Sequence, residues 1–209
     1  MYPTDNSFWV AYKQHNFVPT LITEMNTQHT QREWALRFVK QFRNCIDIGS
    51  QYGFWTRRLQ QKFDIVHCFE SSTLARQCFV KNIDMKGIKL YPYGLSYKKE
   101  RLTSNGEGFI NFRNFEENIG YQTFIEVKTL DSFKLTDIDF IKIDVDGFEL
   151  QVLEGARETI RQSSPVICME SKPLKRRKTH NQSRRLLLKE GYRYESQIKN
   201  EHIWVKKVI

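Results

Sequence analysis

The chain has 209 residues, of which 40% are hydrophobic, and it carries a formal net charge of +9. This length favours one domain with one hydrophobic core and argues against two full domains. No window approaches the roughly 18 to 20 apolar residues that cross a bilayer, and residues 1–20 lack a basic region followed by an apolar one, so we expect a soluble, cytoplasmic protein. The positive charge is compatible with an anionic partner, nucleic acid included, and equally with a solvated basic surface.

The N-terminal segment is predicted to pack on the domain. Residues 1–22 show no clear period but contain five aromatic residues, which favours an aromatic arm, and residues 23–209 then form the single domain. From about residue 24 to residue 43, aromatic side chains recur at helical spacing and predict a helix that covers a sheet. The four cysteines lack the close pairing of a zinc or redox site, so we expect buried, free thiols.

Residues 45–56 have the pattern of a short buried strand, a glycine-hinged turn and the start of a helix. Asp47 lies near the end of the strand, and Gly49 and Gly53 bracket a loop whose backbone can approach a ligand closely because glycine has no Cβ. The following helix would point its free N–H groups into this loop. A dinucleotide fold would require G-x-G-x-x-G, so the G-x-x-x-G spacing disfavours a nicotinamide dehydrogenase and favours another adenosine-bearing cofactor.

The next strand ends in an acid at an informative distance. Glu70 closes an apolar run and lies 23 residues after Asp47. In doubly wound sheets, an acid about 20 residues past the glycine turn accepts hydrogen bonds from the ribose hydroxyls. Ser71 or Ser72 can cap the following helix, and residues 88–93 predict a third strand. Strands that alternate with helices predict a mostly parallel sheet.

Two further acids end strands in the second half of the chain. The apolar strand at 140–143 ends at Asp144, and the strand at 165–170 ends at Glu170. Ligands of open α/β sheets bind at the carboxyl ends of the strands, so both acids are candidate site residues. Between these strands, the sequence predicts one helix that begins near Gly147. Its expected buried face comprises Val152, Leu153, Ala156 and Ile160.

The remaining segments complete the expected topology. Residues 97–128 have the pattern of loops and short strands, such as the run at 123–127, inserted into the domain. The tail carries a basic helix and then two strands, at 192–196 and 203–208, joined by a turn at Asn200 and Glu201. We therefore expect a terminal antiparallel hairpin.

Together, these motifs resemble those of the FkbM-type methyltransferases, a branch of the class I S-adenosylmethionine-dependent enzymes, over roughly residues 43–208. The resemblance is carried by IDIGSQYGFWT at 46–56, CFES at 68–71, Asn82, YGLS at 93–96, TLDSF at 129–133 and DFIKIDVDGFELQVLEGA at 139–156. The chain departs from the usual family pattern at two places. It has Ser50-Gln51 where the family usually has Ala-Asn, and Asp146 where it usually has Glu.

The resemblance implies an α/β, Rossmann-like class I methyltransferase fold, with a mostly parallel seven-stranded sheet and a C-terminal antiparallel hairpin. It also implies S-adenosyl-L-methionine as the cofactor, with its methionine end at the glycine loop and its adenine near residues 94–96. The cofactor-binding residues expected from it are Asp47, Gly49, Ser50, Gly53, Glu70, Ser71 and Leu95. Family members mostly methylate hydroxyl groups, so a small sugar-like or metabolite acceptor is expected.

O-methylation requires alignment of the acceptor with the methyl group and removal of the hydroxyl proton. Asp144 is the first candidate for the base and Glu170 the second. An ordinary carboxylate is a weak base for an alcohol, so burial or a metal ion would have to help. These two acids, with Asp146 and Glu149, could ligate Mg²⁺, although acids at a helix start also stabilise the helix dipole, which is the favoured interpretation. Lys142 could pair with one of them.

A basic run follows the strand that ends at Glu170 and is expected to flank the mouth of the site. Lys172, Arg176 and His180 could hold a phosphate or carboxylate of an anionic acceptor, or belong to a solvated basic surface. Two other functions stay open at this point. One is a nucleic-acid methyltransferase that acts on an RNA end, ribose or base, and the other is a noncatalytic binding protein on the same fold.

Overall fold

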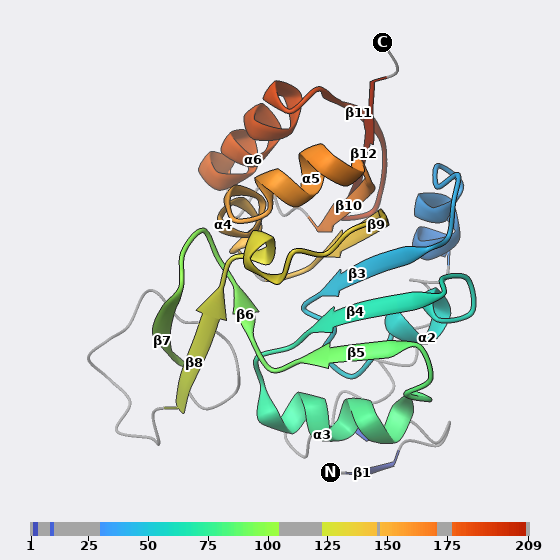
Figure 1. The fold of residues 1–209 in the computed structure, drawn as a ribbon, viewed down its shortest axis with the longest axis vertical. Coiled ribbons are helices and arrows are strands. Elements are labelled where there is room, and N and C mark those ends of the chain that lie inside the picture. Colours follow the sequence, from blue (N-terminus) through green and yellow to red (C-terminus); the bar gives the residue numbers. More distant parts are fainter. Residues whose placement is uncertain are drawn as a thin grey trace.

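A seven-stranded sheet forms the centre of the molecule, with the strand order β11-β12-β10-β9-β3-β4-β5 (Figure 1). The computed structural model describes residues 2–3, 9–10, 30–104, 123–145, 147–170 and 177–207. The strands are β3 (Asn44–Ile48), β4 (Ile65–Phe69), β5 (Ile88–Tyr91), β9 (Ile138–Ile143), β10 (Val166–Glu170), β11 (Tyr192–Ile198) and β12 (Glu201–Lys206).

Five of these strands run parallel, and the last two form an antiparallel hairpin on the edge. Strand β12 pairs antiparallel with β10 and joins the hairpin to the parallel part. The mostly parallel sheet with a C-terminal hairpin is therefore confirmed. Its inner strands are nearly continuous apolar runs because helices cover both of their faces.

The helices and the apolar core lie on the two faces of this sheet. The helices are α2 (Thr56–Leu59), α3 (Thr73–Asn82), α4 (Glu149–Glu154), α5 (Arg157–Ser163) and α6 (Arg177–Lys189), and residues 30–36 are also helical. One core cluster joins β3 and β9 to α4, α5 and α6 through residues such as Ile48, Leu153 and Leu187. The other joins the opposite face to α2 and α3 through Leu59 and Phe79.

The single helix predicted after Gly147 is instead two short helices, α4 and α5, which meet at Gly155 and Ala156. Gly155 ends α4, and a Cβ there would lie 2.1 Å from the carbonyl oxygen of Ser96. The backbone after β6 therefore packs directly against this glycine. The apolar spacing within the segment was correct, since Val152, Leu153, Ala156 and Ile160 are all buried, but it could not reveal the break.

A smaller three-stranded sheet lies beside the main one. It consists of β6 (Gly94–Leu95), β7 (Glu100–Ser104) and β8 (Thr123–Lys128) in the order β6-β8-β7, and the 3-10 helix η2 (Leu130–Phe133) leads from it back to β9. The expected strand at 123–127 corresponds to β8. Residues 105–122 of the predicted insert lie outside the described residues.

At the N-terminus, β1 (Tyr2–Pro3) and β2 (Trp9–Val10) form a two-stranded antiparallel sheet. Val10 is fully buried against Tyr52, Ala75 and Cys78, so this part of the segment packs on the domain beside α3. All four cysteines are buried and free, as expected from their spacing. Within the described ranges, no helix has the length and apolarity required to span a membrane.

Candidate cofactor and catalytic site

The loop that follows β3 lies across the carboxyl ends of β4 and β9. Gly49 has φ +79° and Gly53 has φ +91°, a backbone region that favours glycine. The N–H groups of Gly49 and Ser50 both donate to the carbonyl oxygen of Phe69, at 2.9 and 3.2 Å. A Cβ on Gly49 would lie 1.9 Å from the carbonyl oxygen of Asp144. Glycine is therefore required where the loop meets the end of β9.

Two residues inside the loop have unusual features. The backbone of Gln51 has φ +48°, a value that residues other than Gly and Asn seldom adopt. Ser50 is only 4% exposed, and its hydroxyl has no hydrogen-bond partner among the residues that the structure describes. A buried polar atom without a partner is costly, so a ligand that bonds to the Ser50 hydroxyl would remove a penalty.

Glu70 is held at the end of β4 by two backbone groups. Its Oε2 accepts from the N–H of Gln51 at 2.9 Å, and its Oε1 accepts from the N–H of Ser72 at 2.7 Å. Burial is the largest effect on the pKa of Glu70 and raises it. A carboxylate has about four lone-pair sites, so two such bonds fix its orientation and leave capacity for hydroxyl donors.

Ser72, rather than Ser71, caps α3, since its hydroxyl accepts from the N–H of Ala75 at 3.2 Å. Ser71 lies next to the start of β6, because a Cβ on Gly94 would be 3.9 Å from the Ser71 Cβ. Leu95 is buried in the core cluster under the same edge. The structure thus places the start of β6, residues 94–95, beside Ser71, which directly follows Glu70 at the end of β4.

Asp47 lies below the loop rather than on its surface. It is 1% exposed, and its Oδ2 accepts from the hydroxyl of Thr56 at 2.6 Å. Burial raises its pKa to about 6, although the Thr56 hydrogen bond and the Lys142 charge both act in the opposite direction. Asp47 therefore joins β3 to the first turn of α2 from the inside of the domain.

A buried lysine lies next to the candidate base. The Lys142 ammonium is 3.2 Å from Oδ2 of Asp144 and 3.2 Å from Oε1 of Glu201, and its side chain has no exposed surface. The prediction that Lys142 pairs with an acid of this site is confirmed. Burial lowers the pKa of Lys142, but the two carboxylates outweigh it and hold the pKa above its usual value. The ammonium also lies 4.9 Å from the centre of the Trp55 ring.

Glu201 is the residue of this cluster that the sequence did not reveal. It was expected in the hairpin turn, but it begins β12 and is 4% exposed. The Sγ of Cys168 donates to Oε2 of Glu201 at 3.3 Å, and Glu170 is its partner across the strands. The continuous apolar run from Ile203 to Val205, two residues further on, was the available sequence signal for a strand next to Glu201.

The two candidate catalytic acids end neighbouring parallel strands. Asp144 follows Ile143, whose register partner is Met169, and Glu170 follows Met169, so the acids lie at the same level of the sheet. The N–H of Asp144 donates to the carbonyl oxygen of Ile48 at 3.0 Å, which fixes Asp144 beside the glycine loop. This edge therefore combines an acid with the loop where a cofactor is expected.

The described residues give no support to a metal site. Among them, no group of three or more His, Cys, Asp or Glu side chains could hold a metal ion. Glu149 instead accepts from the N–H of Gly147 at 2.8 Å at the start of α4, in keeping with its interpretation as a helix-start acid. Asp146 lies outside the described residues.

Of the three predicted acceptor-binding residues, His180 alone is in the described part of the chain, while Lys172 and Arg176 are outside it. His180 lies on α6 and packs edge to face against His202, with ring centres 5.2 Å apart. Burial, followed by the Arg184 charge, lowers its pKa. Because adjacent strand residues face opposite ways, this contact is on the other face of β12 from Glu201.

The fold and the glycine loop define a class I S-adenosylmethionine-dependent methyltransferase. A sequence model of the methyltransferase FkbM domain matches residues 70–194. The chain therefore belongs to the FkbM methyltransferase domain family. This match begins at Glu70, after the glycine loop. Comparison with curated proteins found no match.

Solved methyltransferases share this fold at low sequence identity. Methyltransferase FkbM from Methylobacillus flagellatus KT is 17% identical with a TM-score of 0.56, and the match covers 79% of this chain and 43% of that one. Precorrin-6y C5,15-methyltransferase from Geobacter metallireducens GS-15 is 14% identical with a TM-score of 0.57, with 96% and 93% covered. Magnesium protoporphyrin IX methyltransferase from Synechocystis PCC 6803, solved with bound SAM, is 10% identical with a TM-score of 0.51, with 95% and 86% covered. This chain thus spans less than half the length of the FkbM structure.

Proposed function

We propose that this protein transfers the methyl group of S-adenosylmethionine to a hydroxyl of a small sugar-like or metabolite acceptor that carries an anionic group. The observation that carries this proposal is the position of Asp144, an acid packed against Gly49 of the glycine loop and held there from below by Lys142. When bound, S-adenosylmethionine supplies an electrophilic methyl group on a sulfonium.

The residues around the loop suit this cofactor. The Ser50 hydroxyl is buried and lacks a partner among the described residues, while Gly49 and Gly53 let the backbone approach a ligand. The carboxylate of Glu70 is oriented by two backbone N–H groups and retains lone pairs for two ribose hydroxyls. Ser71 and Leu95 stand near the same end of β4 and would border the adenine.

Asp144 is assigned the role of orienting the acceptor hydroxyl and receiving its proton. The adjacent Lys142 ammonium favours the ionised carboxylate, which is the form that accepts a hydrogen bond. As the acceptor oxygen forms its bond to carbon, its proton becomes strongly acidic, so an ordinary carboxylate then suffices as base. Glu170, at the same level of the sheet, is the second candidate.

The first experiment separates the cofactor site from the chemistry. Calorimetry should show binding of S-adenosylmethionine and S-adenosylhomocysteine to the wild type, and Glu70→Ala should weaken both about 10-fold or more through loss of a charged acceptor. Asp144→Asn should bind both ligands within a few-fold of the wild type. Absence of binding to the wild type would contradict the proposal.

Transfer from S-adenosylmethionine labelled on its methyl group would then identify the acceptor class. Sugars with and without a phosphate form one matched pair, and metabolites with and without a carboxylate form another. In each pair, labelling should favour the anionic member. Asp144→Asn should lower turnover about 100-fold or more, the usual range for a general base. Labelling that is equal with and without the anionic group would remove that part of the proposal.

A nucleic-acid acceptor is the second candidate, because α6 exposes several basic side chains. These are Lys178, Arg184, Arg185 and Lys189. RNA that binds through its phosphates would show affinity that falls steeply with salt, with a slope near the number of phosphates contacted. Salt-insensitive or absent binding would exclude this candidate.

A further inference from the structure

One amide side chain connects the N-terminal strand, helix α3 and the glycine loop. Oδ1 of Asn82, the last residue of α3, accepts from the N–H of Trp9 at 2.6 Å. Its Nδ2 donates to the carbonyl oxygen of Trp9 at 2.9 Å and to that of Tyr52 at 2.9 Å. The Asn82 side chain thus hydrogen-bonds to both backbone groups of Trp9, as a neighbouring β-strand does. The same amide also bonds to Tyr52 in the glycine loop.

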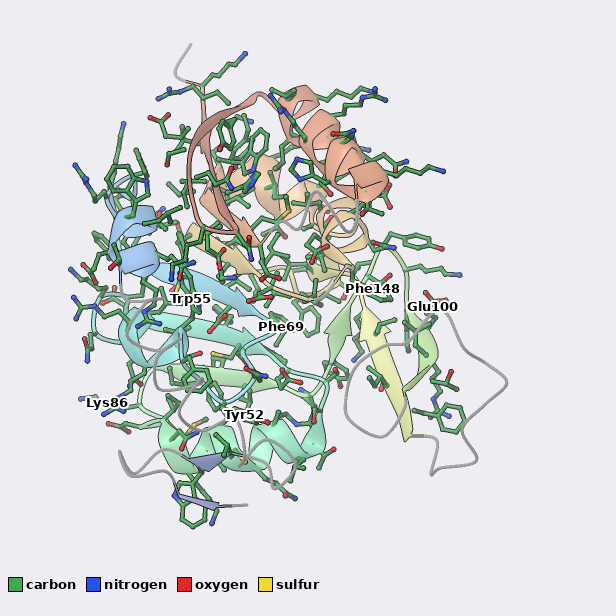
Figure 2. All side chains as sticks on the ribbon, turned by 180° about the vertical axis from the view of Figure 1, so that it is seen from behind. Tyr52, Trp55, Phe69, Lys86, Glu100 and Phe148 are labelled. Atoms are coloured by element: carbon green, nitrogen blue, oxygen red, sulfur yellow. The ribbon has the colours of Figure 1, made fainter. Side chains whose placement is uncertain are left out.

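Apolar and cationic contacts hold the same three segments together. Val10 is fully buried and packs in one cluster with Tyr52, Ala75 and Cys78. The ammonium of Lys81 lies 3.9 Å from the centre of the Trp9 ring. Tyr52 is 3% exposed and lies beside α3 (Figure 2). The short strand β2 therefore packs on a surface formed by α3 and the loop.

The loop depends on its surroundings for its shape. Gly49, Gln51 and Gly53 all have positive φ, which glycine adopts readily, but for Gln51 it is a sparsely populated backbone region. Such conformations persist when neighbouring groups restrict the alternatives. The bond from Asn82 to the Tyr52 carbonyl restricts the loop between Gln51 and Gly53, and a Cβ on Gly53 would lie 2.5 Å from Ile83, the residue after Asn82.

We propose that Asn82 is a positioning residue for S-adenosylmethionine, which presets the glycine loop through Tyr52 and couples it to the docking of β2 through Trp9. The inference rests on the proposed function, because it assumes that this loop holds the cofactor. By thermodynamic linkage, docking of β2 and binding of the cofactor then favour each other by the same factor. Asn82 acts on the cofactor through the loop and contacts no reacting atom.

Two full-length variants test the two halves of the proposal. Asn82→Asp keeps an acceptor for the Trp9 N–H but places a carboxylate against two carbonyl oxygens. Val10→Asp introduces a charge at a fully buried position and displaces β2 while Asn82 remains intact. Val80→Ala, on the same helix at a residue that is 50% exposed, is the control. Circular dichroism establishes that each variant is folded.

Calorimetry with S-adenosylhomocysteine and hydrogen exchange of residues 9–10 and 51–53 are the readouts. In the wild type, the ligand should slow exchange at both segments. Asn82→Asp should weaken ligand binding about 10-fold, the effect of one lost hydrogen bond, and remove the ligand-dependent protection of residues 9–10. Val10→Asp should weaken binding several-fold, and Val80→Ala should bind as the wild type does.

The outcomes separate this inference from the proposed function. If the wild type binds no S-adenosylhomocysteine, the proposed function fails and the coupling fails with it. If the wild type binds and both variants bind within twofold of it, the coupling alone is overturned. If Asn82→Asp does not fold, Val10→Asp alone tests the coupling. Undocking of β2 must then weaken the binding of S-adenosylhomocysteine, and unchanged affinity overturns the coupling.

Discussion

The Lys142 ammonium lies 3.2 Å from Oδ2 of Asp144 on a side chain that is fully buried. Its second partner, Glu201, is buried, whereas the Asp144 side chain is 35% exposed, so the carboxylate that this lysine neutralises within the core is that of Glu201. Lys142→Met should destabilise the protein by about 3 to 5 kcal/mol, because it leaves buried carboxylate charge without a partner. Urea unfolding at pH 7 measures this loss.

The double variant Lys142→Met/Glu201→Gln supplies the control for that prediction. Removal of both charges leaves less unpaired charge in the core, so the double variant should recover about 1 kcal/mol or more relative to Lys142→Met alone. If the two substitutions are simply additive, with no recovery, the ion pair does not govern stability at this site.

Asp47 should make stability depend on pH with an unusual sign. Burial raises its pKa to about 6, whereas an aspartate in the unfolded chain titrates near 4. The folded state therefore binds this proton more tightly, and the stability that it contributes is present below about pH 4 and is lost as the pH rises through about 6. Asp47→Asn has no proton to lose at this position.

The difference in unfolding free energy between Asp47→Asn and the wild type should therefore change in favour of the variant by about 2 kcal/mol from pH 4 to pH 7. Comparison within the pair cancels the titration of every other group. Urea unfolding at several pH values in this range provides the measurement. A difference that stays constant across the range would show that Asp47 titrates at its ordinary pKa.

Local sequence patterns were sufficient to predict the main sheet and one of the two ion pairs of Lys142, the pair with Asp144. The buried strands β3 and β9 are apolar runs, and alternate residues of a strand share a face, so the pairing of Lys142 with Asp144 could be expected. The order of the acids along the sheet also follows from parallel strands that end together.

The remaining features depend on contacts between distant parts of the chain. Glu201 meets Lys142 only through the antiparallel register of β12 against β10, which no local pattern encodes. The break between α4 and α5 reflects the approach of the Ser96 backbone to Gly155. The bond from Asn82 to Trp9 spans 73 residues, and neither residue has a local feature that predicts it.

Gln51 offers a test of the departure from the usual family sequence. Its φ of +48° lies in the left-handed region, where Asn is several-fold enriched over most side chains, and the family usually has Asn at this position. Gln51→Asn should therefore stabilise the protein by about 0.5 to 1 kcal/mol. Its backbone bond to Glu70 does not depend on the side chain.

Thermal unfolding of Gln51→Asn and Gln51→Ala provides the comparison. Both variants shorten the side chain, but alanine has no amide that favours the left-handed region, so it should bring no gain. Equal stability of the two variants would mean that backbone strain at residue 51 is not what distinguishes glutamine from asparagine here.

Gly49 and Gly191 form a matched pair that separates backbone strain from a steric clash. Both have positive φ, +79° and +77°, so alanine at either position incurs a similar conformational cost of about 1 to 2 kcal/mol. Among the described residues, a Cβ on Gly191 would meet only the end of Lys206 at 3.6 Å, whereas a Cβ on Gly49 would lie 1.9 Å from the Asp144 carbonyl oxygen.

Gly191→Ala should therefore lose about 1 to 2 kcal/mol and keep its affinity for S-adenosylhomocysteine. Gly49→Ala should lose about 3 kcal/mol or more, because the loop must also move away from the end of β9, and ligand affinity should fall with it. Urea unfolding and calorimetry on the two variants measure both effects. Equal losses of stability, with ligand affinity unchanged in both, would mean that contact between Gly49 and the Asp144 backbone is not what holds the loop at the end of β9.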